Sequence, residues 1–179
     1  HEHTKRWAAA GHRVTVVTTA PNFPAGRVFE GYRNRLWQRE TIDGVEVIRL
    51  WTYITANEGF LRRTLDYVSF MVAAILATPL LPRPDVIVST SPQFFTACGA
   101  YVVSRLKRRP WVFELRDLWP DSIVAVGAMK ETVLIRALRR LEYFLYRRST
   151  RIVSVTNSFR DVLSKNGIEC GVVHLHTLK

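Results

Sequence analysis

The sequence predicts one doubly wound α/β domain, in which helices cover both faces of a parallel sheet. Short β-branched runs alternate along the chain with longer helical segments, as in consecutive βαβ units. The chain has 179 residues, 47% hydrophobic and 23% charged, which is enough to bury a core. Neither an internal repeat nor a low-complexity linker interrupts the alternation.

The first half of the chain predicts two helices and two strands. Residues 5–10 are helix formers that end at Gly11, a residue typical of helix C-caps. Residues 14–19 are β-branched and apolar, which indicates a buried strand. The turn pair Asp43-Gly44 leads into a second strand at 45–51, and an apolar helix follows at 60–81.

The second half predicts a regular alternation of strands and helices. The helix at 131–148 has an apolar stripe with helical spacing. The predicted strands are 85–89, 111–115, 151–155 and 171–176, and the predicted helices are 93–108, 131–148 and 158–166.

One apolar run, from residue 67 to 81, has 15 residues without a charge. A helix that spans a membrane needs roughly 17–25 apolar residues, so the run predicts a buried helix. The alternative is a helix that lies on a bilayer, with Arg62, Arg63 and Arg83 at the headgroups.

Charge and cysteine content narrow the classes of partner and site. There are 26 Lys and Arg against 15 Asp and Glu, so the formal charge is +11. This charge favours nucleic acid, acidic headgroups or phosphorylated ligands. Cys98 and Cys170 make neither a disulfide framework nor a zinc site by themselves, which indicates a reducing compartment. His174 and His176 lack a third ligand nearby, so no metal is expected there.

In a doubly wound sheet, ligands bind beyond the carboxyl ends of the strands. This rule selects the loops at 20–27, 89–93, 116–128 and 156–158, which we expect to lie side by side on one rim. No glycine-rich phosphate loop and no nucleophile elbow of the G-x-S-x-G type occurs in the sequence.

The third loop is the richest in functional groups. Arg116 could hold a phosphate or carboxylate, Asp117 could accept a proton or bind a sugar hydroxyl, and Trp119 could stack on a sugar ring. Further carboxylates stand nearby at Glu114 and Asp121. The alternative is an ion-paired turn with the tryptophan in the core.

Two other loops admit both a capping role and a ligand-binding role. Ser91 or Thr90 could cap the helix that follows, or contact a polar ligand at its positive end. Thr156, followed by Asn157 and Ser158, is a capping signal first and a ligand contact second.

Several of these segments, in this order and spacing, resemble a known family. The segments are GHRVTVVT (11–18), NFP (22–24), IDGV (42–45), STSP (89–92), RDLWPDS (116–122) and VT (155–156). They resemble the N-terminal half of bacterial family-4 glycosyltransferases, and in particular the colanic-acid and O-antigen group with its fucosamine-transferase-like members. The resemblance covers about nine-tenths of the chain, and RDLWPDS is its most specific part.

The resemblance implies one half of a GT-B architecture, in which two Rossmann-like domains face each other across a cleft. Residues 1–179 would be a single N-terminal, acceptor-binding domain without its opening strand and without the C-terminal donor domain. We therefore expect the fragment alone to be inactive. Many relatives carry a histidine where this chain has Arg116, so Asp117 is the residue carried over most directly.

The resemblance also implies the reaction. A sugar moves with retention from a nucleotide-sugar, UDP-linked, to a sugar on a polyprenyl diphosphate in surface polysaccharide assembly. Neither a cofactor nor a metal is implied, and the enzyme would be cytoplasmic and peripheral on the anionic inner membrane. Asp117 would be catalytic, and the substrate-binding residues would be Arg116, Glu114, Trp119, Ser91, Gln93, Asn22 and Thr156.

Two other classes stay open at this stage. The charge suits a non-catalytic domain that binds nucleic acid or an anionic membrane, but the basic residues are spread over several helices and no nucleic-acid-binding motif appears. The apolar run at 67–81 would suit a membrane-anchored protein of unknown chemistry.

Overall fold

The computed structural model describes residues 2–55, 60–91, 93–121 and 132–172, and it divides into two compact units. The first unit spans His1–Ala77 and the second spans Thr78–Lys179, and each contains its own sheet. Strands and helices succeed one another in both units, so the Rossmann-like α/β class expected from the sequence is confirmed.

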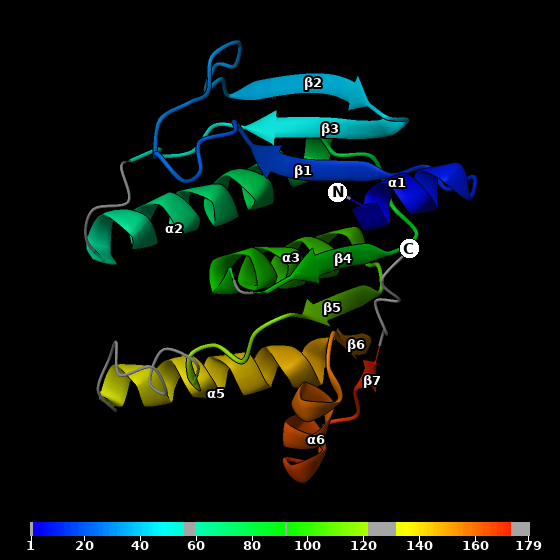
Figure 1. Ribbon diagram of the computed structural model, residues 1–179, viewed down its shortest axis with the longest axis vertical. Helices are drawn as coiled ribbons and strands as arrows, with labels where there is room; N and C mark the ends of the chain where they lie inside the picture. The colour runs from blue at the N-terminus through cyan, green and yellow to red at the C-terminus, as the bar shows by residue number, and fades with distance from the viewer. Residues whose placement is uncertain (1, 56–59, 92, 122–131, 173–179) are drawn as a thin grey trace. The chain divides into compact units, whose positions relative to one another are not determined.

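The first unit consists of a three-stranded sheet and two helices (Figure 1). Its elements are α1 (Glu2–Ala9), β1 (Thr15–Thr19), β2 (Trp37–Ile42), β3 (Val45–Leu50) and α2 (Phe60–Ala77). The strands lie in the order β1-β3-β2, and β1 runs parallel to β3 whereas β2 runs antiparallel to it. β2 was not predicted, and its direction departs from the expected all-parallel arrangement.

A two-residue turn joins β2 to β3. Asp43 and Gly44 both have positive φ, at 51° and 76°. A tight hairpin turn of the primed type requires positive φ at both central residues, and glycine adopts it without steric cost. The turn predicted at these two residues is therefore confirmed, and it sets the register in which Ile42 pairs with Val45.

The helix α2 contains most of the apolar run, which continues through a 3₁₀ turn at Thr78–Leu80. α2 packs against β1 and β3, as a buried helix should. However, Leu65, Val72 and Leu76 are 55%, 43% and 73% exposed, and Ala77 is the one buried residue among the described side chains of α2, so the helix is half-buried and not the fully buried helix that the sequence predicted. Within the described residues, no helix has both the length and the apolar character needed to cross a membrane.

The second unit contains a fully parallel four-stranded sheet in the order β4-β5-β6-β7 (Figure 1). Helices separate the successive strands, as βαβ units require. The elements are β4 (Ile87–Thr90), α3 (Phe94–Lys107), β5 (Trp111–Leu115), α5 (Val133–Arg148), β6 (Arg151–Ser154), α6 (Asn157–Lys165) and β7 (Gly171–Val172). The parallel βαβ arrangement predicted for this half is confirmed.

The core of the second unit is built around one face of β5. Trp111, Phe113 and Leu115 alternate with more exposed residues along the strand and are at most 3% exposed. The Phe113 ring lies 5.4 Å from that of Tyr146 on α5, and the Trp111 indole N–H donates to the buried Ser89 hydroxyl over 2.9 Å. This core fixes the position of β5, whose carboxyl end carries the candidate site.

Candidate active site

Three of the four loops expected on one rim lie side by side in the second unit. β4, β5 and β6 are neighbouring parallel strands, so their carboxyl ends meet at one edge of the sheet. The Ser91 N–H donates to the Glu114 carbonyl over 3.0 Å, and the Val155 N–H donates to the Leu115 carbonyl over 3.3 Å. The loop at 20–27 belongs to the first unit. Pro92, residues 122–128 of the third loop, His174 and His176 lie outside the described residues.

The Ser91 hydroxyl holds the start of the third loop. It accepts hydrogen bonds from the backbone N–H groups of Arg116 (2.7 Å) and Asp117 (3.0 Å), and it donates to the Asp117 carbonyl over 3.4 Å. A hydroxyl has one donor and two acceptor positions, so these bonds use its full capacity. Ser91 is only 5% exposed and therefore anchors the backbone of Asp117.

The capping role predicted for Ser91 or Thr90 is wrong. The N-cap of α3 is Gln93, whose side chain makes no capping hydrogen bond. Its Oε1 instead accepts from the Thr96 hydroxyl over 3.0 Å, and Thr90 donates to the Ser91 carbonyl over 3.0 Å. A cap would need the Ser91 hydroxyl, but this hydroxyl already accepts a hydrogen bond from the backbone N–H of Arg116, which lies 25 residues away in sequence.

Arg116 makes its ion pair with Glu114 rather than with the neighbouring Asp117. One guanidinium nitrogen lies 3.0 and 3.2 Å from the two carboxylate oxygens of Glu114. The two residues are separated by one position, so both point to the same face of the extended chain. The arginine side chain is 45% exposed and can still reach a ligand from there.

Trp119 packs against the core from the third loop. Its ring lies 4.7 Å from the Phe94 ring of α3, and the tryptophan is half-buried. Much of the Trp119 ring therefore packs against the core, as the alternative interpretation of this residue predicted. Pro120, which follows through a cis peptide bond, is fully buried.

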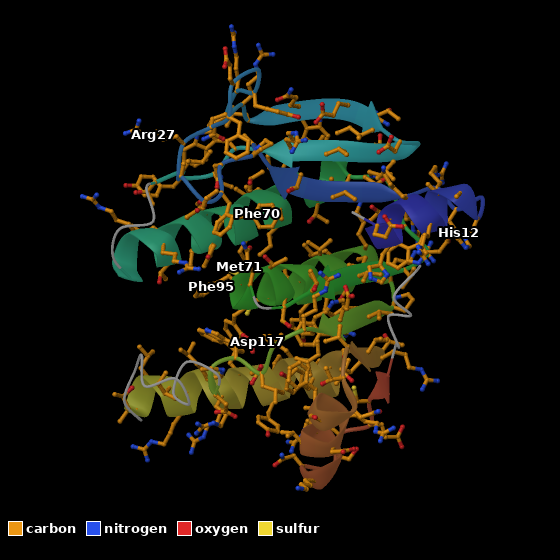
Figure 2. The ribbon with its side chains drawn as sticks, in the orientation of Figure 1. His12, Arg27, Phe70, Met71, Phe95 and Asp117 are labelled. Carbon is orange, nitrogen blue, oxygen red and sulfur yellow. The ribbon has the colours of Figure 1, made fainter. Side chains whose placement is uncertain are left out.

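Asp117 lies where the chain leaves β5 and passes beside α5 (Figure 2). It is half-buried, and its charge acts on the buried carboxyl of Glu142 on α5. Asp121, farther along the same loop, forms an ion pair with Arg139 of α5 at 2.7 Å. The loop after β5 is thus tied to β4 through its backbone and to α5 through its side chains.

Glu142 is a buried carboxyl next to the candidate site, and the sequence analysis missed it. It is 5% exposed, and Tyr146 donates a hydrogen bond to its carboxyl over 2.5 Å. The pKa of Glu142 is raised to about 8, chiefly by burial; the hydrogen bond from Tyr146 lowers it, and the charges of Asp121 and Asp117 raise it. Burial also raises the pKa of Tyr146. The sequence feature that could have revealed it is a glutamate among the core-facing positions of the helix predicted at 131–148.

The fourth loop begins α6 in the way its sequence predicts. The Thr156 hydroxyl accepts a hydrogen bond from the Phe159 N–H over 3.3 Å, so the predicted cap is confirmed. The Ser154 hydroxyl donates to the Thr156 carbonyl over 2.9 Å. Together these bonds fix the loop beside the carboxyl end of β5.

Asn22 lies in the first unit, in the loop that follows β1. The side-chain amide of Asn22 donates to the Ala20 carbonyl over 3.2 Å, and the backbone carbonyl of Asn22 accepts from the Gly26 N–H over 2.7 Å. The residue therefore shapes the turn in which it lies. Phe23 beside it is 72% exposed.

Comparison with known proteins gives the family. The family described as "Glycosyl transferase 4-like domain" matches residues 1–177. The Escherichia coli (strain K12) protein named "Putative colanic acid biosynthesis glycosyl transferase WcaI" is 30% identical over 124 residues, which is 67% of this chain. The match covers 30% of that relative's length. On the strength of a match that spans almost every residue of a Rossmann-like α/β fold, the chain belongs to the glycosyl transferase 4-like family.

Proposed function

We propose that this chain is the acceptor-placing half of a retaining glycosyltransferase that assembles surface polysaccharide. In this proposal residues 1–179 form one Rossmann-like domain of a GT-B enzyme, completed by an opening strand and by a donor domain that holds a UDP-linked sugar. The acceptor is a sugar on a polyprenyl diphosphate. Membership of the family and the colanic-acid name of the Escherichia coli relative support this proposal.

The placement of Asp117 is the observation that carries the proposal furthest. Its backbone is held at both N–H and carbonyl by the buried Ser91 hydroxyl, at the carboxyl end of a core strand. Ligands of α/β sheets bind at this end. A carboxylate on a fixed backbone can be aimed at one acceptor hydroxyl, and such positioning is a main source of catalytic rate.

The proposed step is a direct transfer on one face of the donor sugar. The acceptor hydroxyl gives its proton to the Asp117 carboxylate, and its oxygen forms a bond to the anomeric carbon on the same face from which the diphosphate leaves, so that the configuration is retained. The bond from that carbon to the diphosphate breaks, and the diphosphate leaves with the electron pair. General-base assistance of this kind typically contributes about 10²–10⁴ in rate.

The other proposed substrate-binding residues differ in whether they contact the acceptor directly or act through a neighbour. Arg116 and Gln93 are exposed at the rim and can meet polar groups of the acceptor. Glu114 acts through its ion pair with Arg116, and Ser91 through the loop backbone that it holds. The outer edge of Trp119, together with Thr156 and Asn22, completes the proposed set.

The test is Asp117→Asn in the full-length enzyme, with turnover and thermal unfolding measured on the same sample. We expect turnover to fall by about 10²–10⁴ while the melting temperature stays near that of the parent. Asp161→Asn is the matched control, because Asp161 is an exposed carboxylate of α6 paired with Arg160. Near-normal turnover in Asp117→Asn would remove the residue from the catalytic role, and a large drop in melting temperature would make it structural.

We also propose that the enzyme works at the cytoplasmic face of the inner membrane as a peripheral protein. Residues 101–151 contain 12 Lys and Arg against 5 Asp and Glu, a net charge of +7. Basic residues near an anionic leaflet are attracted by about 1 kcal/mol each. A lipid-linked acceptor would be presented at the same surface.

A further inference from the structure

The helix α5 carries five arginines and a single acidic residue. The arginines are Arg136, Arg139, Arg140, Arg147 and Arg148. The acidic residue, Glu142, points into the core and is only 5% exposed. At neutral pH its raised pKa, about 8, leaves it mostly uncharged. The outer face of α5 therefore carries positive charge with no negative charge of its own.

Large apolar side chains are exposed on this helix. Val133 and Leu134 are 73% and 51% exposed, and Leu141 and Phe144 are 40% and 39% exposed. With 3.6 residues per turn, Val133 and Phe144 lie opposite the buried residues, and Leu134 and Leu141 lie at the border between the two sides; the buried residues are Ile135, Glu142, Leu145 and Tyr146. Spacings of seven residues between Leu134 and Leu141, and of eleven between Val133 and Phe144, keep each pair on one side of a helix.

Little of this charge is neutralised by the rest of the protein. Arg139 is paired with Asp121, and the Arg148 guanidinium lies 5.3 Å from the centre of the Phe144 ring. Among the described residues, no carboxylate forms an ion pair with Arg140 or Arg147. Both arginines line one shallow surface hollow together with Tyr143 and Phe144. The hollow is accordingly lined by basic and aromatic side chains together.

We propose that the outer face of α5, defined by Val133, Arg136, Arg140, Leu141, Phe144 and Arg147, docks on an anionic lipid surface. This inference rests on the proposed function, for which it supplies the membrane-binding element. Positive charge complements the headgroups, and aliphatic side chains between the arginines enter the boundary of the acyl chains. A helix of 16 residues is about 24 Å long and would lie in the plane of the leaflet.

A lipid surface fits this face better than a nucleic acid does. Nucleic-acid sites combine basic side chains with aromatic rings that stack on bases, or with polar groups that reach base edges. Here Val133 and Leu141 are aliphatic and can neither stack on a base nor hydrogen-bond to its edge, whereas the apolar boundary of a lipid layer takes them up. The exposed arginines beside them reach phosphate groups at the surface of that layer.

The experiment measures flotation of the 179-residue chain with vesicles of phosphatidylcholine, with or without 30% phosphatidylglycerol as a chosen probe. We expect binding to the anionic vesicles only, and weaker binding as salt is raised. In Arg140→Gln/Arg147→Gln, the partition coefficient should fall about fivefold for each arginine, hence roughly 25-fold in total. In Val133→Ser/Leu141→Ser, which changes two exposed apolar members of the face, binding should fall while its dependence on salt remains.

Matched controls remove the same groups elsewhere in the second unit. Arg105→Gln/Lys165→Gln removes two exposed basic residues from α3 and α6, and Leu106→Ser removes an apolar side chain that is 60% exposed. Both controls should bind vesicles like the parent chain. Circular dichroism melting of each variant checks the fold, which these exposed positions should leave intact.

Several results would overturn the proposal. The first is an equal loss of vesicle binding in Arg105→Gln/Lys165→Gln and in Arg140→Gln/Arg147→Gln, and the second is unchanged binding in Arg140→Gln/Arg147→Gln. The third is equal binding of the parent chain to neutral and anionic vesicles. The fourth is binding to a single-stranded RNA oligomer but to no vesicle. Sugar transfer by the full-length enzyme to a water-soluble acceptor separates this inference from the proposed function. Lost vesicle binding with retained transfer overturns the docking face alone, and retained binding with no transfer overturns the proposed function alone.

Discussion

The two sheets of this protein are held together by different kinds of side chain. In the first sheet, charged and polar groups join the strands: Arg49 of β3 lies 2.6 Å from Glu40 of β2, and Thr15 of β1 donates to Glu46 of β3 over 2.7 Å. In the second sheet, aromatic rings stack behind β5, from Trp111 through Phe113 to Tyr146. In the first sheet, charged and polar pairs thus add to the buried aliphatic residues of β3, whereas the second sheet depends on buried aromatic volume.

This difference determines what each unit tolerates. Aromatic side chains contribute through the large area that they bury, so the second unit should respond to any loss of volume. A charged pair contributes little as a pair, but removing one partner leaves a charge without compensation. The first unit should therefore respond to an unbalanced charge, and should recover when the partner is removed as well.

The largest effect is expected from Trp111→Ala, which breaks the aromatic core. Trp111 is 1% exposed, and its indole N–H bonds to Ser89. The loss should destabilise the second unit by about 3–5 kcal/mol, as measured by urea unfolding followed by circular dichroism. The control Trp51→Ala removes an indole that is 43% exposed, and should cost under about 1 kcal/mol. Similar losses in both variants would contradict the volume argument.

The next effect sharpens the comparison, because Glu142 is the one buried carboxyl among the residues that the structure describes, and it lies beside the aromatic core. Burial raises its pKa from the usual 4.5 to about 8, so the folded state holds a proton that the unfolded state releases. Stability from this group is complete below about pH 4.5 and is lost as the pH rises to about 8, with an upper limit of about 5 kcal/mol.

Unfolding measured across that pH window tests this expectation. Glu142→Gln should remove most of the decline, since the amide cannot ionise, and the exposed control Glu169→Gln should keep it. An equal decline in all three proteins would show that other groups cause it.

The smallest of the three effects is expected in the first sheet. Arg49 is 8% exposed, bonds to Glu40 and to the Thr19 carbonyl, and lies 5.0 Å from the Tyr32 ring. Arg49→Met leaves the Glu40 carboxylate unpaired. Because that carboxylate is 29% exposed, the expected cost is about 1–3 kcal/mol, below that of a fully buried pair.

The double variant Arg49→Met/Glu40→Leu should regain most of the loss in the same urea titration. Failure of the second change to restore stability would mean that Arg49 acts through Thr19 and Tyr32 rather than through its ion pair. That result would weaken the contrast between the two sheets.

The sequence predicted those parts of the fold that local patterns determine. Apolar periodicity located the strands and helices of the second unit, and Asp43-Gly44 marked the hairpin turn. β2 was missed because Gln38, Arg39 and Glu40 form no apolar run. Its charged side chains find their partners on β3, including the ion pair of Arg39 with Glu46, and such partners become visible only once two strands are paired.

The same distinction applies to the candidate site. Asp117 could be placed at the end of a core strand because a buried strand precedes it in sequence. The anchoring role of Ser91 and the pairing of Arg116 with Glu114 depend on which groups meet in space. Glu142 was overlooked because a polar residue on an apolar stripe reveals its burial only after the helix has been packed.

The buried indole of Trp111 also gives the second unit an optical signature of its own. Its N–H is bonded inside the core, whereas Trp7 and Trp51 of the first unit are 39% and 43% exposed. Indoles shielded from water emit at shorter wavelengths than hydrated ones and are harder for acrylamide to quench. Emission from Trp111 therefore falls at the blue edge of the intrinsic fluorescence, and that from Trp7 and Trp51 at the quenchable red edge, with the half-buried Trp37 and Trp119 between them.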